Sequence, residues 1–136
     1  MTEDWTALGR QVVADGLLQR MREHLGLNRS SMAHLLQTTP TIYTGWETKP
    51  GTVLRPHTAA RVGRFYHLAM LQLELLEADG IKLSLLIPLH HALNLLAVPQ
   101  ELMMKLYREH KFEAEDLGIL GLWLYEEDLE EIRGLL

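Results

Sequence analysis

The chain has 136 residues, no cysteine, 47% hydrophobic residues and a formal net charge of −5. A chain of this length forms one domain or two small ones and buries a modest core. The lack of cysteine excludes disulfides and thiol sites and suits a reducing cytoplasm. The acidic start, Met1 to Asp4, is unlike a signal peptide, and the apolar runs are far shorter than the ~20 residues that cross a bilayer. We therefore expect a soluble cytoplasmic protein that makes no membrane contact.

The charge is divided unevenly along the chain. Residues 1–68 contain eight Lys and Arg against five Asp and Glu, a local charge of +3, whereas residues 69–136 contain five against thirteen, a local charge of −8. Binding to phosphate depends on the local potential rather than on the total charge. The first half can therefore bind nucleic acid, whereas the second half, taken whole, would be repelled by it.

The first predicted helix runs from Leu17 to Leu25. Leu17, Leu18, Met21 and Leu25 recur at helical spacing, so one face of this helix is apolar and points inward. Gly26 follows at the position where a glycine commonly ends a helix.

A second helix is predicted from about Arg29 to Gln37. Asn28 is a good N-cap for it, because its side chain can accept a hydrogen bond from a free backbone N–H of the first turn. The buried stripe of this helix would consist of Met32, Leu35 and Leu36.

A third helix is predicted from about Pro40 to Thr48. Thr39 can cap it, and Pro40 is tolerated at the first helical position because its missing N–H would have no partner there. Tyr43 and Trp46 lie three residues apart and should face inward. The segment Lys49-Pro50-Gly51 ends the helix.

These helices resemble the lambda-repressor-like (Xre-type) helix-turn-helix family. The resemblance covers roughly Leu17 to Leu68. It departs from the family pattern at the turn glycine, which is Gln37 here, and at the basic residue before the tryptophan, which is Gly45. The first departure bears on the geometry of the turn, and the second weakens direct recognition of guanine. The residues that match are Leu27, Asn28, Arg29, Ala33, Leu35, Leu36, Trp46 and Glu47.

The resemblance implies that the third helix enters the major groove of DNA while the second crosses the phosphate backbone. Arg29 would then contact phosphate, where the helix N-terminus also favours an anion. Threonine hydroxyl and methyl groups can meet base edges and thymine methyls, although less selectively than arginine, so DNA shape would contribute. A helical hairpin of another kind of bundle is the alternative. The candidate DNA-contacting residues are Arg29, Ser30, Thr39, Pro40, Thr41, Thr44, Gly45, Thr48, Lys49 and Arg55.

A long helix is predicted from His57 to about Asp79, with Gly80 as its stop. It begins with basic residues and ends with acidic ones, and we expect it to connect the two halves. Arg61 and Arg64 on this helix either contact phosphate or form part of a solvated face.

The second half contains two more predicted helices, residues 90–96 and 100–110, separated by a turn at Val98-Pro99. Glycines at 118 and 121 within an apolar, β-prone run predict a small hairpin or wing near residues 117–125, with a short helix as the alternative. A last helix should begin at Asp128-Leu129. The buried residues of the 100–110 helix would be Leu102, Met103, Leu106 and Tyr107.

This order of elements is similar to the MerR and excisionase type of winged helix-turn-helix, over roughly His90 to Ile132. In that family the residues equivalent to Lys105, Arg108 and Lys111 meet phosphates. Here five carboxylates surround them, so we expect this half to bind another protein chain or to contact DNA only weakly. The five are Glu101, Glu109, Glu113, Glu115 and Asp116.

Catalytic and metal sites are not expected. None of the seven histidines forms a His-Glu-x-x-His motif or a pair four residues apart, and no cysteine can complete a zinc site. No glycine-rich phosphate loop is present, and the serines lack a nucleophile-elbow context. We therefore expect no enzyme, no metal and no cofactor.

The sequence as a whole predicts a mostly α-helical protein with two small helix-turn-helix units joined by a long helix. The expected parts are residues 1–56, a connecting helix over 57–80, and a winged-helix-like domain over 81–136. We expect a sequence-specific double-stranded DNA-binding transcriptional regulator that represses by occluding a promoter, as a homodimer or as a monomer with two DNA-contacting units. Small repressors of this kind are frequent in phages and mobile elements, so a bacterial cell or a phage-infected host is the expected setting. The alternative is a protein-interaction module, an antitoxin or adaptor, whose acidic second half holds a protein partner.

Overall fold

The computed structural model describes residues 4–49 and 51–136, and the chain folds into two compact units, Met1–Leu75 and Leu76–Leu136. The described residues are mostly helical, with a small three-stranded antiparallel sheet, and this confirms the predicted fold class. The helix expected to connect the halves is continuous and belongs to the first unit as far as Leu75.

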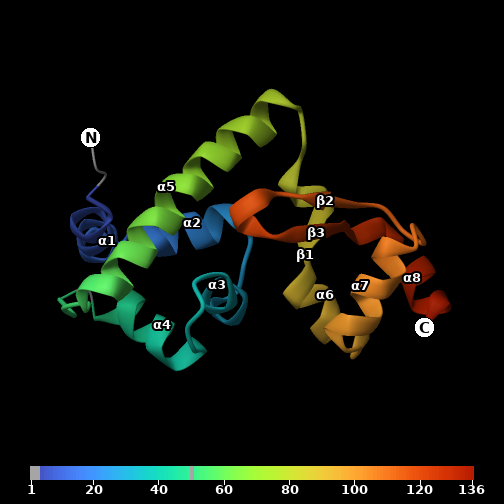
Figure 1. Ribbon diagram of the computed structural model, residues 1–136, viewed down its shortest axis with the longest axis horizontal. Helices are drawn as coiled ribbons and strands as arrows, with labels where there is room; N and C mark the ends of the chain where they lie inside the picture. Colours follow the sequence, from blue (N-terminus) through green and yellow to red (C-terminus); the bar gives the residue numbers. More distant parts are fainter. Residues whose placement is uncertain (1–3, 50) are drawn as a thin grey trace. The chain divides into compact units, whose positions relative to one another are not determined.

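The first unit is built from helices (Figure 1). Three of them agree with the helices predicted between residues 17 and 48, and the fourth is the long helix. The remaining one, α1, is not predicted by the sequence patterns; the Asp4 side chain caps it by accepting a hydrogen bond from Ala7 N at 3.1 Å. The helices are α1 (Trp5–Ala14), α2 (Leu17–Leu25), α3 (Arg29–Leu35), α4 (Pro40–Thr48) and α5 (Pro56–Ala78).

The predicted start and stop signals of these helices are confirmed. Gly26 adopts a left-handed conformation with φ of 70° at the end of α2. Asn28 accepts a hydrogen bond from Ser31 N at 2.8 Å, and Thr39 accepts one from Ile42 N at 3.2 Å. Pro50, expected to help end α4, lies outside the described residues.

Two glycines allow α1 and α5 to touch backbone to backbone. A Cβ atom on Gly9 would lie 1.7 Å from the carbonyl oxygen of Ala59, and one on Gly63 would lie 2.1 Å from that of Trp5. Beside this crossing the ring centroids of Trp5 and His67 are 5.1 Å apart. Any larger residue at either glycine would force the two helices apart.

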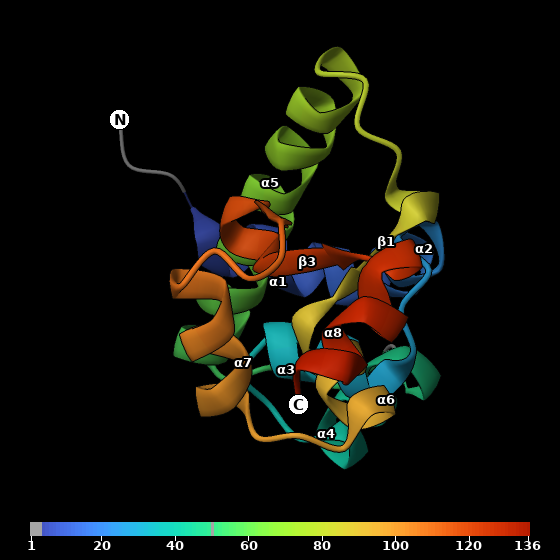
Figure 2. The same cartoon turned by 90° about the vertical axis from the view of Figure 1, so that its right-hand side faces the viewer.

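The second unit contains three short strands and three helices among its described elements (Figure 2). The strand order is β1-β3-β2, with Leu124 opposite Ile87 on one side and Ala114 on the other. The predicted hairpin is confirmed as β2 and β3, and Gly118 and Gly121 in its turn both have positive φ. The elements are β1 (Leu86–Pro88), α6 (Leu89–Leu96), α7 (Gln100–Arg108), β2 (Ala114–Asp116), β3 (Leu122–Tyr125) and α8 (Leu129–Leu135).

The core of this unit lies between one face of the sheet and the helices. Its buried residues are Ile87, Ala92, Met103, Leu124 and Ile132. The prediction that Leu102 is buried is wrong, because its side chain is 38% exposed. Adjacent positions of a helix point about 100° apart, so the burial of Met103 turns its neighbour toward solvent.

Within residues 4–49 and 51–136, no helix combines the length and apolar character needed to cross a membrane.

Candidate nucleic-acid interface

The turn between α3 and α4 closes with Gln37 rather than a glycine. Gln37 adopts φ of 57°, which is a left-handed conformation. Its N–H donates to the carbonyl of His34 at 3.1 Å, and Thr38 N donates to the carbonyl of Ala33 at 3.0 Å. A residue with a Cβ atom is disfavoured in this conformation, so the packing of the two helices holds the glutamine there.

A buried ion-pair cluster fixes α4 against the two preceding helices. Glu47, in the last turn of α4, accepts bonds from Arg22 Nε at 2.7 Å and Arg22 Nη2 at 3.0 Å, and from Arg29 Nε at 3.0 Å. The Glu47 side chain is only 1% exposed. A bidentate arginine combines strength with defined geometry, so this cluster sets how α2, α3 and α4 lie together.

The cluster keeps Glu47 ionised. Burial raises the pKa of this carboxyl, but the hydrogen bonds from Arg22 and Arg29 outweigh burial, and its pKa lies below the ordinary value. The hydrogen bond to Glu47 raises the pKa of Arg22 in turn. Burial, together with the neighbouring carboxylate, raises the pKa of Tyr43 well above its usual range. The negative charge of α4 is thus buried and compensated rather than presented to solvent.

Arg29, predicted to contact phosphate, has a structural role as well. Its Nε is bound to Glu47, while 42% of its side chain stays exposed. Its terminal nitrogens make no hydrogen bond within the described parts of the chain, so they can still meet an anion. Sequence patterns did not reveal this ion pair, because its partners lie 18 residues apart and no local spacing connects them.

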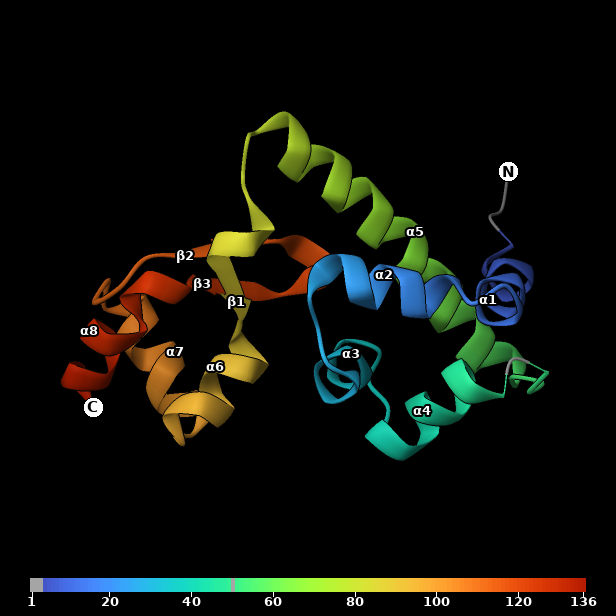
Figure 3. The same cartoon turned by 180° about the vertical axis from the view of Figure 1, so that it is seen from behind.

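Most of the predicted contact residues lie in α4 or next to it in the sequence, and Figure 3 shows this helix with α3 from behind. They divide into exposed and half-buried groups. Thr48 uses its hydroxyl hydrogen internally, donating to the carbonyl of Thr44 at 2.9 Å. Ile42 is 51% exposed on the first turn and was missed as a candidate. Thr44 and Gly45 are half-buried, whereas Ser30, Thr39, Pro40, Thr41, Thr48, Lys49 and Arg55 are exposed.

The part of the sequence that contains α4 is basic. Between Glu23 and Glu74 the sequence contains a single acidic residue, Glu47, which is the one that the cluster buries. The same stretch contains five cations, of which all but the half-buried Arg29 are exposed. They are Arg29, Lys49, Arg55, Arg61 and Arg64. Residues 24–73 therefore present positive charge with no exposed carboxylate among the described positions.

The second unit carries its cations among exposed acids. Lys105, Arg108 and Lys111 are all exposed, and Lys105 Nζ lies 4.0 Å from a carboxylate oxygen of Glu109. Glu101 is exposed one turn before Lys105 on α7. The chain entering α8 adds four exposed carboxylates, Glu126, Glu127, Glu130 and Glu131.

The hairpin of the second unit is also acidic. The hydroxyl of Tyr125 on β3 donates to a carboxylate oxygen of Glu115 on β2. This hydrogen bond, with a contribution from burial, raises the pKa of Tyr125 to about 12. Asp116 accepts a bond from Gly118 N at 3.1 Å and so shapes the turn.

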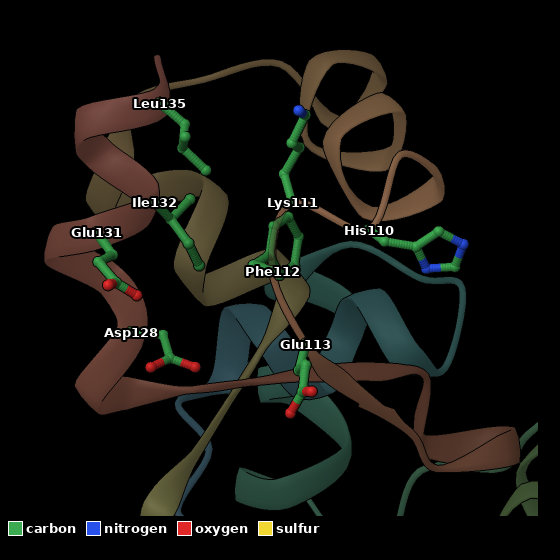
Figure 4. Close-up of a pocket in the computed structure, with 8 residues that line it drawn as sticks. All are labelled: His110, Lys111, Phe112, Glu113, Asp128, Glu131, Ile132 and Leu135. Atoms are coloured by element: carbon green, nitrogen blue, oxygen red, sulfur yellow. The ribbon is translucent and has the colours of Figure 1, made fainter.

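An open cavity of about 300 Å³ lies in the second unit (Figure 4). Asp128, just before α8, and Glu131 on α8 stand on one side and Lys111 on the other, while His110 points away. Its polar lining residues are half-buried or exposed. The lining consists of His110, Lys111, Phe112, Glu113, Asp128, Glu131, Ile132 and Leu135.

The described residues contain no group of three or more His, Asp or Glu side chains placed to hold a metal ion. Comparison with protein-family models, with curated protein sequences and with solved structures gave no match to this chain.

Proposed function

We propose that the chain is a sequence-specific double-stranded DNA-binding protein and acts as a transcriptional repressor by occluding a promoter. α4 would enter the major groove, and α3 would cross the phosphate backbone. The observation that carries the proposal is the burial of Glu47, the only acidic residue between positions 24 and 73, in a stretch whose other charged residues are all Lys or Arg. A carboxylate exposed at this place would repel phosphate, and the cluster removes that repulsion.

The exposed part of α4 supplies groups suited to base edges. Thr41 offers a hydroxyl and a methyl group, and Ile42 offers apolar surface for thymine methyls. Lys49 and Arg55 would hold the phosphates on either side and set the register of α4 without reading sequence. Because no arginine lies on the exposed face of α4, selectivity would depend on methyl contacts and on DNA shape.

The likeness of residues 17–68 to the lambda-repressor-like family supports the same function. In this chain and in that family, two short helices meet at a tight turn, and a Trp-Glu pair lies at the end of the second helix. The order of the second unit, a strand, two helices and a hairpin, supports a winged-helix relationship, which by shape alone implies no particular partner.

A fluorescence anisotropy titration with mixed genomic DNA at two salt concentrations tests the proposal. We expect affinity to fall steeply as salt rises. Fragments selected from random DNA should share a site that the intact chain binds more tightly than bulk DNA. Thr41→Ala should reduce the preference for that site, whereas Lys49→Ala should weaken binding to all sequences alike. Failure to bind any duplex at low salt would exclude the proposal.

A second candidate is a protein-interaction module, favoured by the surface of the second unit. There the cations of α7 lie beside exposed Glu101 and Glu109, and α8 begins with exposed acids. Such a surface suits a basic partner. If the intact chain fails to bind DNA but binds a polycationic peptide in a salt-dependent way, this second function is favoured.

A further inference from the structure

The outer face of α5 carries an apolar stripe that no described element covers completely. Leu71 and Leu75 are 45% and 58% exposed, Ala78 is exposed, and Leu68 is half-buried. These four residues follow one another at spacings of three, four and three. That is the spacing of the a and d positions along which two helices pack in a coiled coil.

The stripe is distinct from the face that α5 buries in its own chain. Phe65, Ala69 and Leu76 are at most 3% exposed. On a helix with 3.6 residues per turn, these positions centre about 120° around the helix axis from Leu71 and Leu75. α5 is therefore apolar on two sides, and only one of them is satisfied within the chain.

The ends of the stripe carry opposite charges. Arg61 and Arg64 precede it, Glu74, Glu77 and Asp79 accompany its far end, and no charged residue other than histidine lies between Arg64 and Glu74. Two α5 helices side by side in parallel would place like charges together. In antiparallel orientation, each basic end would meet an acidic end. The partly positive N-terminus of each helix would also lie beside the partly negative C-terminus of the other.

We propose that α5 pairs in antiparallel orientation with α5 of a second copy of this chain. In the register that aligns the stripes, Leu68 lies opposite Leu75 of the second copy, and Leu71 packs near its own symmetry mate. Arg64 then meets Asp79 of the second copy. The contact is isologous, because each helix offers the other the same surface, and it closes at two chains.

The pairing buries few layers of side chains, so the dimer should be weak. Stable interfaces bury roughly 1,200–2,000 Å², and a few apolar layers of one helix pair fall below that range. We expect dissociation constants on the order of micromolar. The inference does not depend on DNA binding, although a dimer would supply two copies of α4 to one duplex.

Sedimentation equilibrium of the intact chain without DNA, across a concentration series, tests the pairing. The expected result is a monomer–dimer equilibrium that Leu71→Glu and Leu75→Glu each shift at least tenfold toward the monomer. Leu95→Glu is the matched control: Leu95 is a 52% exposed leucine on α6, and its substitution should leave the equilibrium unchanged. Circular dichroism melts of each variant would show that folding is retained, as expected for exposed positions.

The orientation is tested by exchanging charges. Arg64→Asp and Asp79→Arg should each weaken the dimer, and the variant carrying both should recover it, since the two charges meet again with their signs reversed. A monomer at every concentration, or a dimer indifferent to Leu71→Glu, would overturn the proposal. A double exchange that stays as weak as either single change would overturn the antiparallel register.

Discussion

The two units contain the same local arrangement of helices with opposite electrostatic character. In both, a short helix is followed by a tight turn in which a residue other than glycine has positive φ, Gln37 at 57° before α4 and Ala97 at 54° before α7. The acid of α4 is buried and bound by two arginines, whereas Glu101 and Glu109 beside α7 are exposed. Similar backbone geometry therefore does not determine which molecule each unit binds. The two surfaces differ in where a few carboxylates are placed.

The largest contrast in stability should appear when one glutamate is removed from each unit, Glu47 from the first and Glu101 from the second. Glu47→Ala should lower the free energy of unfolding by about 3 kcal/mol, since it leaves Arg22 partly buried without its partner. This is the low end of the usual range because Arg29 remains partly solvated. Glu101→Ala should change stability by no more than about 0.5 kcal/mol, as surface substitutions do. Urea unfolding of both variants measures the contrast, and equal effects would show that the cluster is not stabilising.

The next contrast is in DNA binding. Lys49→Ala combined with Arg55→Ala should lower the slope of log affinity against log salt by about two units, one for each phosphate that no longer has a cation beside it. The triple alanine variant of Lys105, Arg108 and Lys111 should lower it by less, because neighbouring glutamates already reduce the attraction of these cations for phosphate. Anisotropy titrations at several salt concentrations give both slopes. A larger decrease from the triple variant would assign DNA contact to the second unit.

Acid should destabilise the first unit through Glu47. Its folded pKa lies below the ordinary value of 4.5, so its stabilisation is fully present above about that pH and is lost as pH falls through the folded pKa. Glu47→Gln should be less stable than the wild type at neutral pH, and the difference should shrink below pH 4.5. Hydrogen exchange of α4 amides against pH gives this comparison. A difference that persists unchanged at low pH would contradict the assignment.

The smallest effect concerns Tyr125 in the second unit. Because Glu115 accepts the hydroxyl hydrogen, the phenol should ionise near pH 12 instead of 10. The stabilisation from this bond is fully present below pH 10 and is lost as pH rises toward 12. A tyrosine absorbance titration, with Tyr125→Phe subtracted, isolates this group. Glu115→Gln should return its pKa toward 10, and an unshifted titration would remove the bond from the hairpin.

The elements that the sequence predicted correctly are those with local signals. The caps of α3 and α4 are satisfied within three residues, at Asn28 and Thr39, and Gly26 ends α2 through its own backbone conformation. Apolar spacing placed Tyr43 and Trp46 in the core. Such signals connect residues that are adjacent or one helical turn apart, so they can be recognised in the chain itself.

Other features depend on residues far apart and were missed. β1 is a three-residue segment that becomes a strand only by pairing with β3, nearly forty positions later. α1 lies against α5 through Gly9 and Gly63, whose importance is visible only when the two backbones meet. The exposure of Leu102 depends likewise on which side of α7 the sheet covers.

The sequence by itself determined the helical character of the chain, its charge asymmetry and the residues of α4, because each follows from local spacing or from composition. Tertiary structure alone decided the state of Glu47. A glutamate after a tryptophan carries no local mark of burial, and the arginines that compensate it lie 25 and 18 residues earlier. Packing of α2, α3 and α4 brings the three charges within hydrogen-bonding distance and removes the Glu47 carboxylate from water, while Arg29 stays partly exposed.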